Sequence, residues 1–140
     1  MRLLTEDLAR AGLWALLAAT DVYLSLHSSE SLGLTILEAM SLGVPAVATG
    51  FGGNIDYLDD GNGVLVPFRL VPARGGIYEG LGDWAEPDIE AAAAGLVGLR
   101  DDPGLRRRLG KAARETVHKR YTPLAYRDRV RGRLRSLGLP

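Results

Sequence analysis

The chain has 140 residues, a size typical of one domain, and 46% hydrophobic and 24% charged residues, an ordinary globular composition. It contains no cysteine and two histidines, which excludes disulfides and cysteine-based metal sites and argues against a histidine-rich one. The formal net charge is zero, but residues 1–102 carry 5 basic and 15 acidic residues, whereas residues 105–140 carry 12 basic and 2 acidic ones.

A basic segment of this kind can indicate a nucleic-acid or membrane-surface partner. The segment has neither the interleaved aromatic residues nor the glycine-rich loops of common nucleic-acid modules, so we expect solvated helices and no nucleic-acid partner. The apolar residues 11–19 are too few to span a bilayer, and the N-terminus does not resemble a signal peptide. We therefore expect a cytoplasmic protein without stable membrane insertion.

The first third of the chain alternates between helical and strand patterns. Residues 5–19 have apolar residues at roughly helical spacing, which predicts a helix. Residues 21–27 are apolar with few polar breaks and predict a buried strand, followed by a loop over 28–32. Residues 33–42 predict a second helix, which Gly43 would end as a C-cap.

The middle of the chain predicts two more short strands, over residues 45–49 and 64–66. A turn over 50–53, a single helical turn over 54–58 and a turn cluster over 59–63 connect them. Residues 68–85 contain several glycines and prolines, which predict a long loop.

Three helices are expected to close the chain. They would begin with Pro87 at the first helical position, at Asp101-Asp102-Pro103, and at Thr122-Pro123, the last forming a helical segment over 122–138. The expected apolar faces of the second and third are Leu105, Leu109, Ala112 (or Ala113) and Val117, and Tyr126, Val130, Leu134 and Leu137.

This alternation of strands and helices predicts an α/β fold, a Rossmann-like parallel sheet with flanking helices, in a single domain over residues 1–140. Ligands bind such sheets at the carboxyl ends of the strands. We therefore expect the segments Ser28–Gly33 and Gly50–Asn54 to lie on the same rim.

Two carboxylates flank the predicted start of a helix on that rim. Glu30 lies in the loop, Glu38 lies eight residues later in the helix, and Gly33, Leu34 and Thr35 form its first turn. Helix N-termini bind anions through unpaired N–H groups, and carboxylates accept hydrogen bonds from vicinal hydroxyls. The residue types alone leave two alternatives open, a sugar-phosphate or nucleotide site and an N-capped helix with two ordinary acids.

The stretch from Asp21 to Thr49 resembles the E-x7-E region of retaining GT-B glycosyltransferases, especially glycosyltransferase family 4. The resemblance continues through the loop Gly52-Gly53-Asn54, through Leu65-Val-Pro67 and through Trp84-Ala-Glu-Pro87 to the helix start after residue 101. It covers nearly the whole chain and implies the later part of a GT-B C-terminal domain.

The resemblance implies that Glu30 lies beside the donor sugar at the reacting centre and that Glu38 binds the ribose hydroxyls. It also implies that the backbone amides of Gly33, Leu34 and Thr35 hold the diphosphate of a nucleotide sugar. Sugar transfer would proceed with retention at the anomeric carbon, without a metal or another cofactor.

Other residues of the two loops are weaker candidates. Ser31 stands with Leu32 where the family commonly has Gly-Phe, so Ser31 would lie near the donor, and Asp56 stands near a usual Glu. Asn54 would bond a ligand hydroxyl or cap the next turn, and His27 would touch the donor sugar or serve the structure. Tyr57 and Tyr78 could stack on a base, but for them, as for Trp14 and Trp84, we expect packing roles. Arg69 and Arg74 are candidates for meeting phosphate.

The chain corresponds to only part of a GT-B enzyme, which has a second, N-terminal acceptor domain. The family's Arg and Lys that neutralise the diphosphate have no counterpart, because Arg2 and Arg10 stand in a different context. We expect the chain to be inactive alone and to be a fragment, a split enzyme that needs a partner chain, or a non-catalytic interaction module or relic. The absent strands would leave an exposed edge near residues 21–27, which predicts a homo-oligomer or a heteromeric complex.

Overall fold

The structure is a computed structural model that describes residues 4–139. Its centre is a three-stranded parallel sheet in the order β1-β2-β3, formed by Tyr23–Ser25, Ala46–Thr49 and Val64–Val66. Residue 24 pairs with residue 47, and residue 47 pairs with residue 64. The predicted α/β class with a parallel sheet and flanking helices is confirmed.

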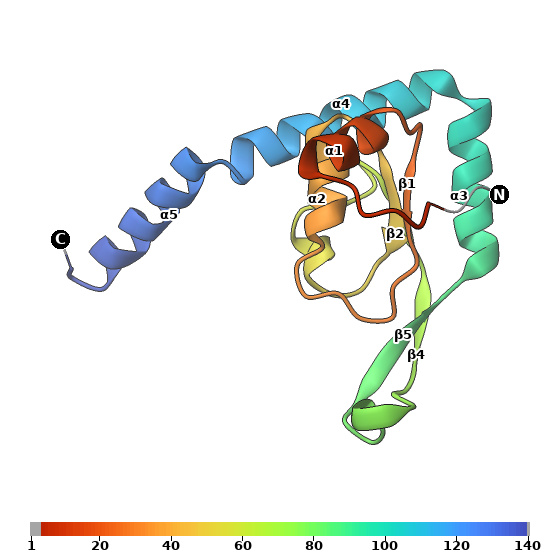
Figure 1. The fold of residues 1–140 in the computed structure, drawn as a ribbon. Helices are drawn as coiled ribbons and strands as arrows, with labels where there is room; N and C mark the ends of the chain where they lie inside the picture. The colour runs from red at the N-terminus through yellow and green to blue at the C-terminus, as the bar shows by residue number, and fades with distance from the viewer. Residues whose placement is uncertain (1–3, 140) are drawn as a thin grey trace.

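Helices enclose the sheet on both faces and at one end (Figure 1). Helices α1 (Arg10–Ala18) and α2 (Leu34–Ser41) cover one face, and α3 (Ile89–Asp101) covers the other. Helix α4 (Pro103–Arg120) crosses the end of the sheet where the strands begin. The opposite end, where the strands finish, carries the loops of interest and the start of α2.

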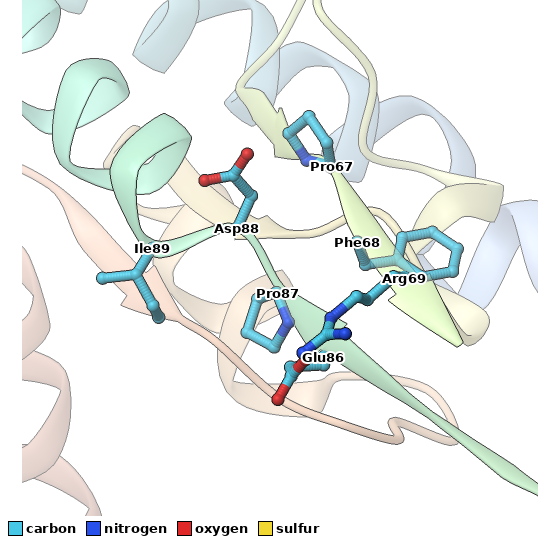
Figure 2. A pocket seen from close by; sticks show the side chains of 7 residues that line it. All are labelled: Pro67, Phe68, Arg69, Glu86, Pro87, Asp88 and Ile89. Atoms are coloured by element: carbon cyan, nitrogen blue, oxygen red, sulfur yellow. The ribbon is translucent and has the colours of Figure 1, made fainter. Parts of the chain in front are cut away.

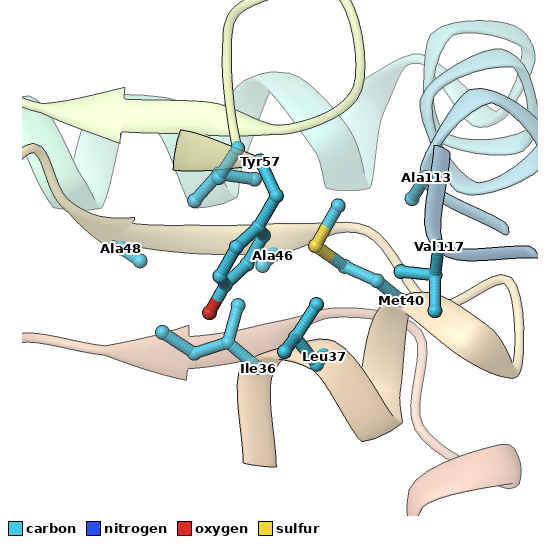
Figure 3. Close-up of a cluster of buried hydrophobic side chains, with 9 residues drawn as sticks. Ile36, Leu37, Met40, Ala46, Ala48, Tyr57, Ala113 and Val117 are labelled. Atoms are coloured by element: carbon cyan, nitrogen blue, oxygen red, sulfur yellow. The ribbon is translucent and has the colours of Figure 1, made fainter. Parts of the chain in front are cut away.

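The buried core follows the alternation of side chains along β2. Ala46 and Ala48 face α2 and α4, in a cluster that also contains Met40, Tyr57 and Val117 (Figure 3). Val47 faces the other way, toward Val66 on β3 and Ala92 and Leu99 on α3. Successive strand residues point to opposite faces, so one four-residue strand contributes to both cores.

A β-hairpin replaces the loop predicted over residues 68–85. Strands β4 (Phe68–Pro72) and β5 (Asp83–Pro87) pair antiparallel, and the 3₁₀ turn η2 (Gly76–Tyr78) lies at their tip. The glycines that suggested a loop are confined to this tip, where Gly75, Gly76, Gly80 and Gly82 all have positive φ. The long-loop prediction was wrong because these turn signals mark only the turn.

The boundaries of several predicted elements need correction. Pro87 ends β5 instead of opening α3, whose N-cap is Asp88 with its carboxylate accepting from the N–H of Ala91 at 2.9 Å. Helix α1 begins at Arg10 instead of residue 5, because Ala9 is extended and provides no side-chain cap. The helical turn expected over 54–58 is the 3₁₀ turn η1 over Gly53–Asp56.

Strand β1 is shorter and less buried than predicted. It covers three residues instead of seven, and Leu24 at its centre is 44% exposed. Within residues 4–139 no strand pairs with its outer side, so β1 is an edge of the sheet. The prediction of a buried strand was therefore wrong, whereas the exposed edge that we expected near residues 21–27 is confirmed.

The C-terminal helices begin where the sequence predicted. Asp102 caps α4 by accepting from the N–H of Leu105 at 2.8 Å, and Ala113, not Ala112, is the buried alanine. Thr122 caps α5 (Pro123–Ser136) by accepting from the N–H of Ala125 at 3.2 Å.

Helix α5 extends away from the body (Figure 1), and none of its residues, all of which the structure describes, is buried. Most of its expected apolar face is therefore uncovered, with Tyr126, Val130 and Leu137 exposed and Leu134 half-buried. No helix in the described part of the chain is long and apolar enough to cross a membrane.

Candidate functional site

Two loops meet at the carboxyl ends of β1 and β2. The backbone N–H of Gly53 donates to the carbonyl of Glu30 at 3.0 Å. A Cβ atom at Gly52 or Gly53 would collide with the backbone of Glu30 or Ser31, so the close approach requires glycine at both positions. The two loops expected to share a rim do lie together.

Glu30 occupies the anion-binding position at the start of α2. One oxygen of its carboxylate, Oε1, accepts from the N–H of Gly33 at 2.9 Å and from that of Leu32 at 3.3 Å. Gly33 is the N-cap of α2 in the left-handed conformation, with φ 75° and ψ 52°. The Gly33 amide expected to hold a diphosphate is thus bonded to Glu30, and a phosphate there would share or displace that carboxylate.

Tyr57 supports the same loop from beneath. Its hydroxyl donates to the carbonyl of Leu32 at 2.7 Å and lies 3.0 Å from that of Gly33. Its ring is 2% exposed and lies between α2 and β2 (Figure 3). Burial, with a smaller contribution from the charge of Glu30, raises the pKa of the Tyr57 phenol, so the hydroxyl remains a donor at neutral pH.

The packing role expected for the Tyr57 ring is correct, but its hydroxyl has a second role that the sequence analysis missed. No spacing or motif in the sequence signals this contact. It depends on where η1 places the tyrosine relative to a loop 24 residues earlier in the chain.

The first turn of α2 presents further groups on the rim. The first helical hydrogen bond runs from the N–H of Leu37 to the carbonyl of Gly33, so the N–H groups of Leu34 and Thr35 have no carbonyl partner within the helix. The Thr35 hydroxyl accepts from the hydroxyl of Tyr23 at 2.8 Å. Glu38 is half-buried and lies four residues after the exposed Leu34, on the same face of α2.

His27 joins the two loops. Its Nε2 lies 2.8 Å from the carbonyl oxygen of Phe51, which can only accept, so Nε2 carries the proton. Its Nδ1 lies 2.9 Å from the hydroxyl of Ser25. Both ring nitrogens are thus used inside the protein, which favours the structural role of the two that we left open.

Ser31 is exposed on the rim, whereas Asn54 is fully buried. The Asn54 side-chain amide donates to the carbonyl of Thr49 at 2.9 Å. This bond ties η1 to the end of β2, but it is not the cap of the next turn that we considered, because η1 has no side-chain cap. Contact of its side chain with a ligand hydroxyl remains a prediction, and it requires that the burial be relieved.

Of the candidate cations, Arg69 lies on β4 and Arg74 lies in the connection between β4 and β5. Arg69 forms an ion pair with Glu86 on the hairpin, and the guanidinium of Arg10 lies over the ring of Trp14 at 5.6 Å. Arg2 lies outside the described residues. Among residues 4–139 no group of three or more His, Asp and Glu side chains is arranged to hold a metal ion, and transfer without a metal stays a prediction.

An open pocket of about 590 Å³ lies at the base of the hairpin (Figure 2). Its lining is mostly apolar and includes Phe68, Pro87 and Ile89, with the Arg69–Glu86 ion pair at its border. Of the candidate donor-binding residues only Arg69 lines it, and no residue of the two rim loops does. This pocket is therefore separate from the Glu30 site.

Comparison with known proteins decides the family. Residues 4–73 match the family described as "Glycosyl transferases group 1". The chain belongs to this family. Glu30, Gly33, Glu38 and both rim loops all lie within the matched residues.

Three curated relatives of the chain carry the names of different transferases and synthases. It is 34% identical over 102 residues to sulfoquinovosyl transferase SQD2 of Arabidopsis thaliana, covering 73% of this chain and 17% of that protein. It is 34% identical over 107 residues to N-acetyl-alpha-D-glucosaminyl L-malate synthase of Bacillus anthracis, covering 76% and 23%. It is 35% identical over 110 residues to D-inositol 3-phosphate glycosyltransferase of Kribbella flavida, covering 79% and 22%.

A solved structure supports the fold. Sucrose-phosphate synthase from Thermosynechococcus elongatus superposes with a TM-score of 0.65 at 26% identity, over 87% of this chain and 26% of that protein. The fold is accordingly that of a GT-B glycosyltransferase. The chain spans about a quarter or less of the length of each of these relatives.

Proposed function

We propose that this group 1 glycosyltransferase chain is the donor-binding portion of a retaining enzyme that transfers a sugar from a nucleoside diphosphate sugar to an acceptor hydroxyl. The observation that carries the proposal is the arrangement at the start of α2. A carboxylate, Glu30, lies against the amides of a left-handed glycine N-cap, and a second carboxylate, Glu38, lies one turn further along the helix.

Each group has a distinct chemical role in this proposal. The free N–H groups of Leu34 and Thr35 bind the diphosphate and stabilise the charge that grows on it as it leaves. Glu30 lies beside the anomeric carbon, where a carboxylate stabilises the positive charge of an oxocarbenium-like transition state. Glu38 accepts hydrogen bonds from the ribose hydroxyls, and Ser31 lines the donor side of the rim.

The rim needs positive charge from elsewhere. Residues 28–35 and 50–56 contain two acidic residues and no lysine or arginine. We infer that an acceptor-binding domain, in a longer protein or in a partner chain, completes the site and supplies cations for the diphosphate. The chain alone then binds nucleotide weakly and does not transfer sugar.

Calorimetric titration of the chain with UDP, GDP and UDP-glucose tests this proposal. We compare the wild type with Glu38→Ala and with a matched control, Asp60→Ala. Asp60 is an exposed carboxylate in the turn before β3, at the end of the sheet opposite the rim. The proposal expects weak binding that Glu38→Ala abolishes and Asp60→Ala preserves. Equal binding by both variants, or none at millimolar nucleotide, contradicts a donor site in this chain.

A non-catalytic interaction module is the alternative, and the uncovered surfaces of the chain favour considering it. Leu24 on the edge strand β1 is exposed, as are Tyr126 and Val130 on α5 and Leu137 at its C-cap. Both proposals place another polypeptide, or a second copy, on these surfaces. Light scattering with size-exclusion chromatography tests self-association, and a clean monomer at high concentration leaves only the heteromeric form.

A further inference from the structure

The β4–β5 hairpin is attached directly to the two rim loops. The backbone N–H of Ala85 on β5 donates to the carbonyl of Ser28 at 2.9 Å. At the base of the hairpin, the rings of Phe68 and Phe51 are tilted against each other with their centroids 5.2 Å apart. The base of the hairpin is therefore attached to the rim next to Glu30, while its tip projects beyond the body (Figure 1).

A pocket of about 540 Å³ lies between the hairpin and the first rim loop. One wall is formed by the aromatic residues Tyr78 and Trp84, whose ring centroids are 5.7 Å apart at an interplanar angle of 53°. The other residues that line the pocket are Ser28, Ser29 and Ser31. No charged side chain lines this space, and Glu30 belongs to the same loop as the three serines.

We propose that this pocket is a subsite for the pyranose ring of a sugar, and the inference rests on the proposed function of the adjacent rim. A sugar ring has an apolar C–H face, which an aromatic side chain covers, and a girdle of hydroxyl groups, which serine hydroxyls can both donate to and accept from. Binding sites for neutral ligands of this size combine aromatic walls with a few polar groups in this way.

Two neighbouring residues at the tip of the hairpin differ in whether they line the pocket. Ile77 precedes Tyr78 and is 80% exposed, but it does not line the pocket, whereas Tyr78 is 52% exposed and does. Replacing either residue by alanine removes an exposed side chain from the same turn. Only Tyr78→Ala removes part of the subsite, so Ile77→Ala is a matched control.

Tryptophan provides the readout because the chain has only Trp14 and Trp84. Trp14 lines a different pocket, next to α4 and α5, so its indole N–H signal in a ¹H–¹⁵N correlation spectrum serves as an internal reference. A Trp14→Phe variant assigns the two signals. Probes are the methyl pyranosides of glucose, galactose, mannose and N-acetylglucosamine, followed by UDP and UDP-glucose.

If the subsite binds sugar, the Trp84 signal shifts with at least one methyl pyranoside or with UDP-glucose, while the Trp14 signal does not shift. A Trp84 shift with a methyl pyranoside but not with UDP-glucose identifies the bound sugar as that of an acceptor. A Trp84 shift with UDP-glucose but not with UDP identifies it as that of the donor. Tyr78→Ala should weaken this binding about three- to tenfold, the scale of one aromatic contact, and Ile77→Ala should leave it unchanged.

Three results overturn the subsite: no Trp84 shift with any probe, equal weakening by Ile77→Ala and Tyr78→Ala, or a full Trp84 shift with UDP alone, which would place the nucleotide base there. These results are distinguishable from a failure of the proposed function. In that case Glu38→Ala would leave nucleotide binding unchanged, whereas the methyl pyranosides test the subsite without any nucleotide.

Discussion

Replacing Tyr57 with phenylalanine removes one hydroxyl group and leaves the buried ring in place. The ring keeps its packing against α2 and β2 and its edge-on contact with Tyr121, whose centroid is 5.6 Å away. What is lost is the hydrogen bond that holds the carbonyl of Leu32, at the start of α2. The variant therefore isolates the contribution of that bond to the loop that carries Glu30.

The geometry sets the expected magnitude. The carbonyl of Gly33 keeps its bond from the N–H of Leu37 at 3.0 Å, so only the carbonyl of Leu32 loses its donor. Leu32 itself is 43% exposed, so the affected loop lies at the surface. We expect Tyr57→Phe to lower the free energy of unfolding by about 1 kcal/mol, the net value of one hydrogen bond, and the Tm by about 3–5 °C.

Urea unfolding and hydrogen exchange measure this effect at two levels. Tyr126→Phe, at a tyrosine that is 66% exposed on α5, is the matched control and should change the unfolding free energy by less than about 0.5 kcal/mol. The amide of Gly33, which is bonded to Glu30, should exchange faster in Tyr57→Phe. Unchanged stability together with unchanged exchange at Gly33 would refute the idea that the Tyr57 hydroxyl holds the loop.

Two further predictions concern the same contact. Gly33→Ala should lower the unfolding free energy by at least about 1–2 kcal/mol, because alanine is strained at a φ of 75° and its Cβ would collide with the Tyr57 hydroxyl. Combined with Tyr57→Phe in a double-mutant cycle, it should lower the unfolding free energy by less than the sum of the two single changes. Strict additivity contradicts the collision. Burial raises the folded-state pKa of Tyr57 above its unfolded value of 10.0, so the stabilisation by this group is present below pH 10 and is lost as the pH rises further. Between pH 9 and pH 11, the unfolding free energy measured in urea should therefore fall less in Tyr57→Phe than in the wild type.

The elements that the sequence predicted well are those defined by local constraints. Strand β2 is a run of four buried residues preceded by proline, and it lies within one residue of its predicted start. Helix α2 lies between Gly33 and Gly43, both of which have positive φ, so its two ends are marked in the sequence. Such signals need no knowledge of the rest of the fold.

The hairpin and the exposure of β1 depend instead on distant partners. The β4–β5 pair forms a separate two-stranded sheet whose strands alternate poorly, with Leu70 55% exposed, so no period in the sequence predicts it. Whether β1 is buried depends on the strand beside it, which its own apolar residues cannot reveal. Tertiary pairing decided both outcomes.

In the candidate site, too, the sequence predicted the features marked by local signals and missed those that depend on distant partners. Glu30 and Glu38 stand out by their spacing and by the glycine between them. The capping of Gly33 by the Glu30 carboxylate, and the support from Tyr57, depend on side-chain directions that the sequence does not specify. The same is true of Tyr78 and Trp84, for which we expected packing roles and which line a pocket beside the serine loop.

The capping carboxylate leads to a last prediction, about charge. A phosphate on the free amides of α2 would lie near Glu30, and at about 5 Å and an effective dielectric constant of about 20 each pair of negative charges costs about 3 kcal/mol. Glu30→Gln removes this charge but keeps an oxygen that can accept from the N–H of Gly33. We therefore expect the variant to bind UDP about ten- to a hundredfold more tightly than the wild type at low salt, with the difference shrinking as salt is added. Calorimetry at two salt concentrations measures it. Weaker binding by Glu30→Gln would mean that the carboxylate assists the nucleotide, and that the phosphate does not bind at the start of α2.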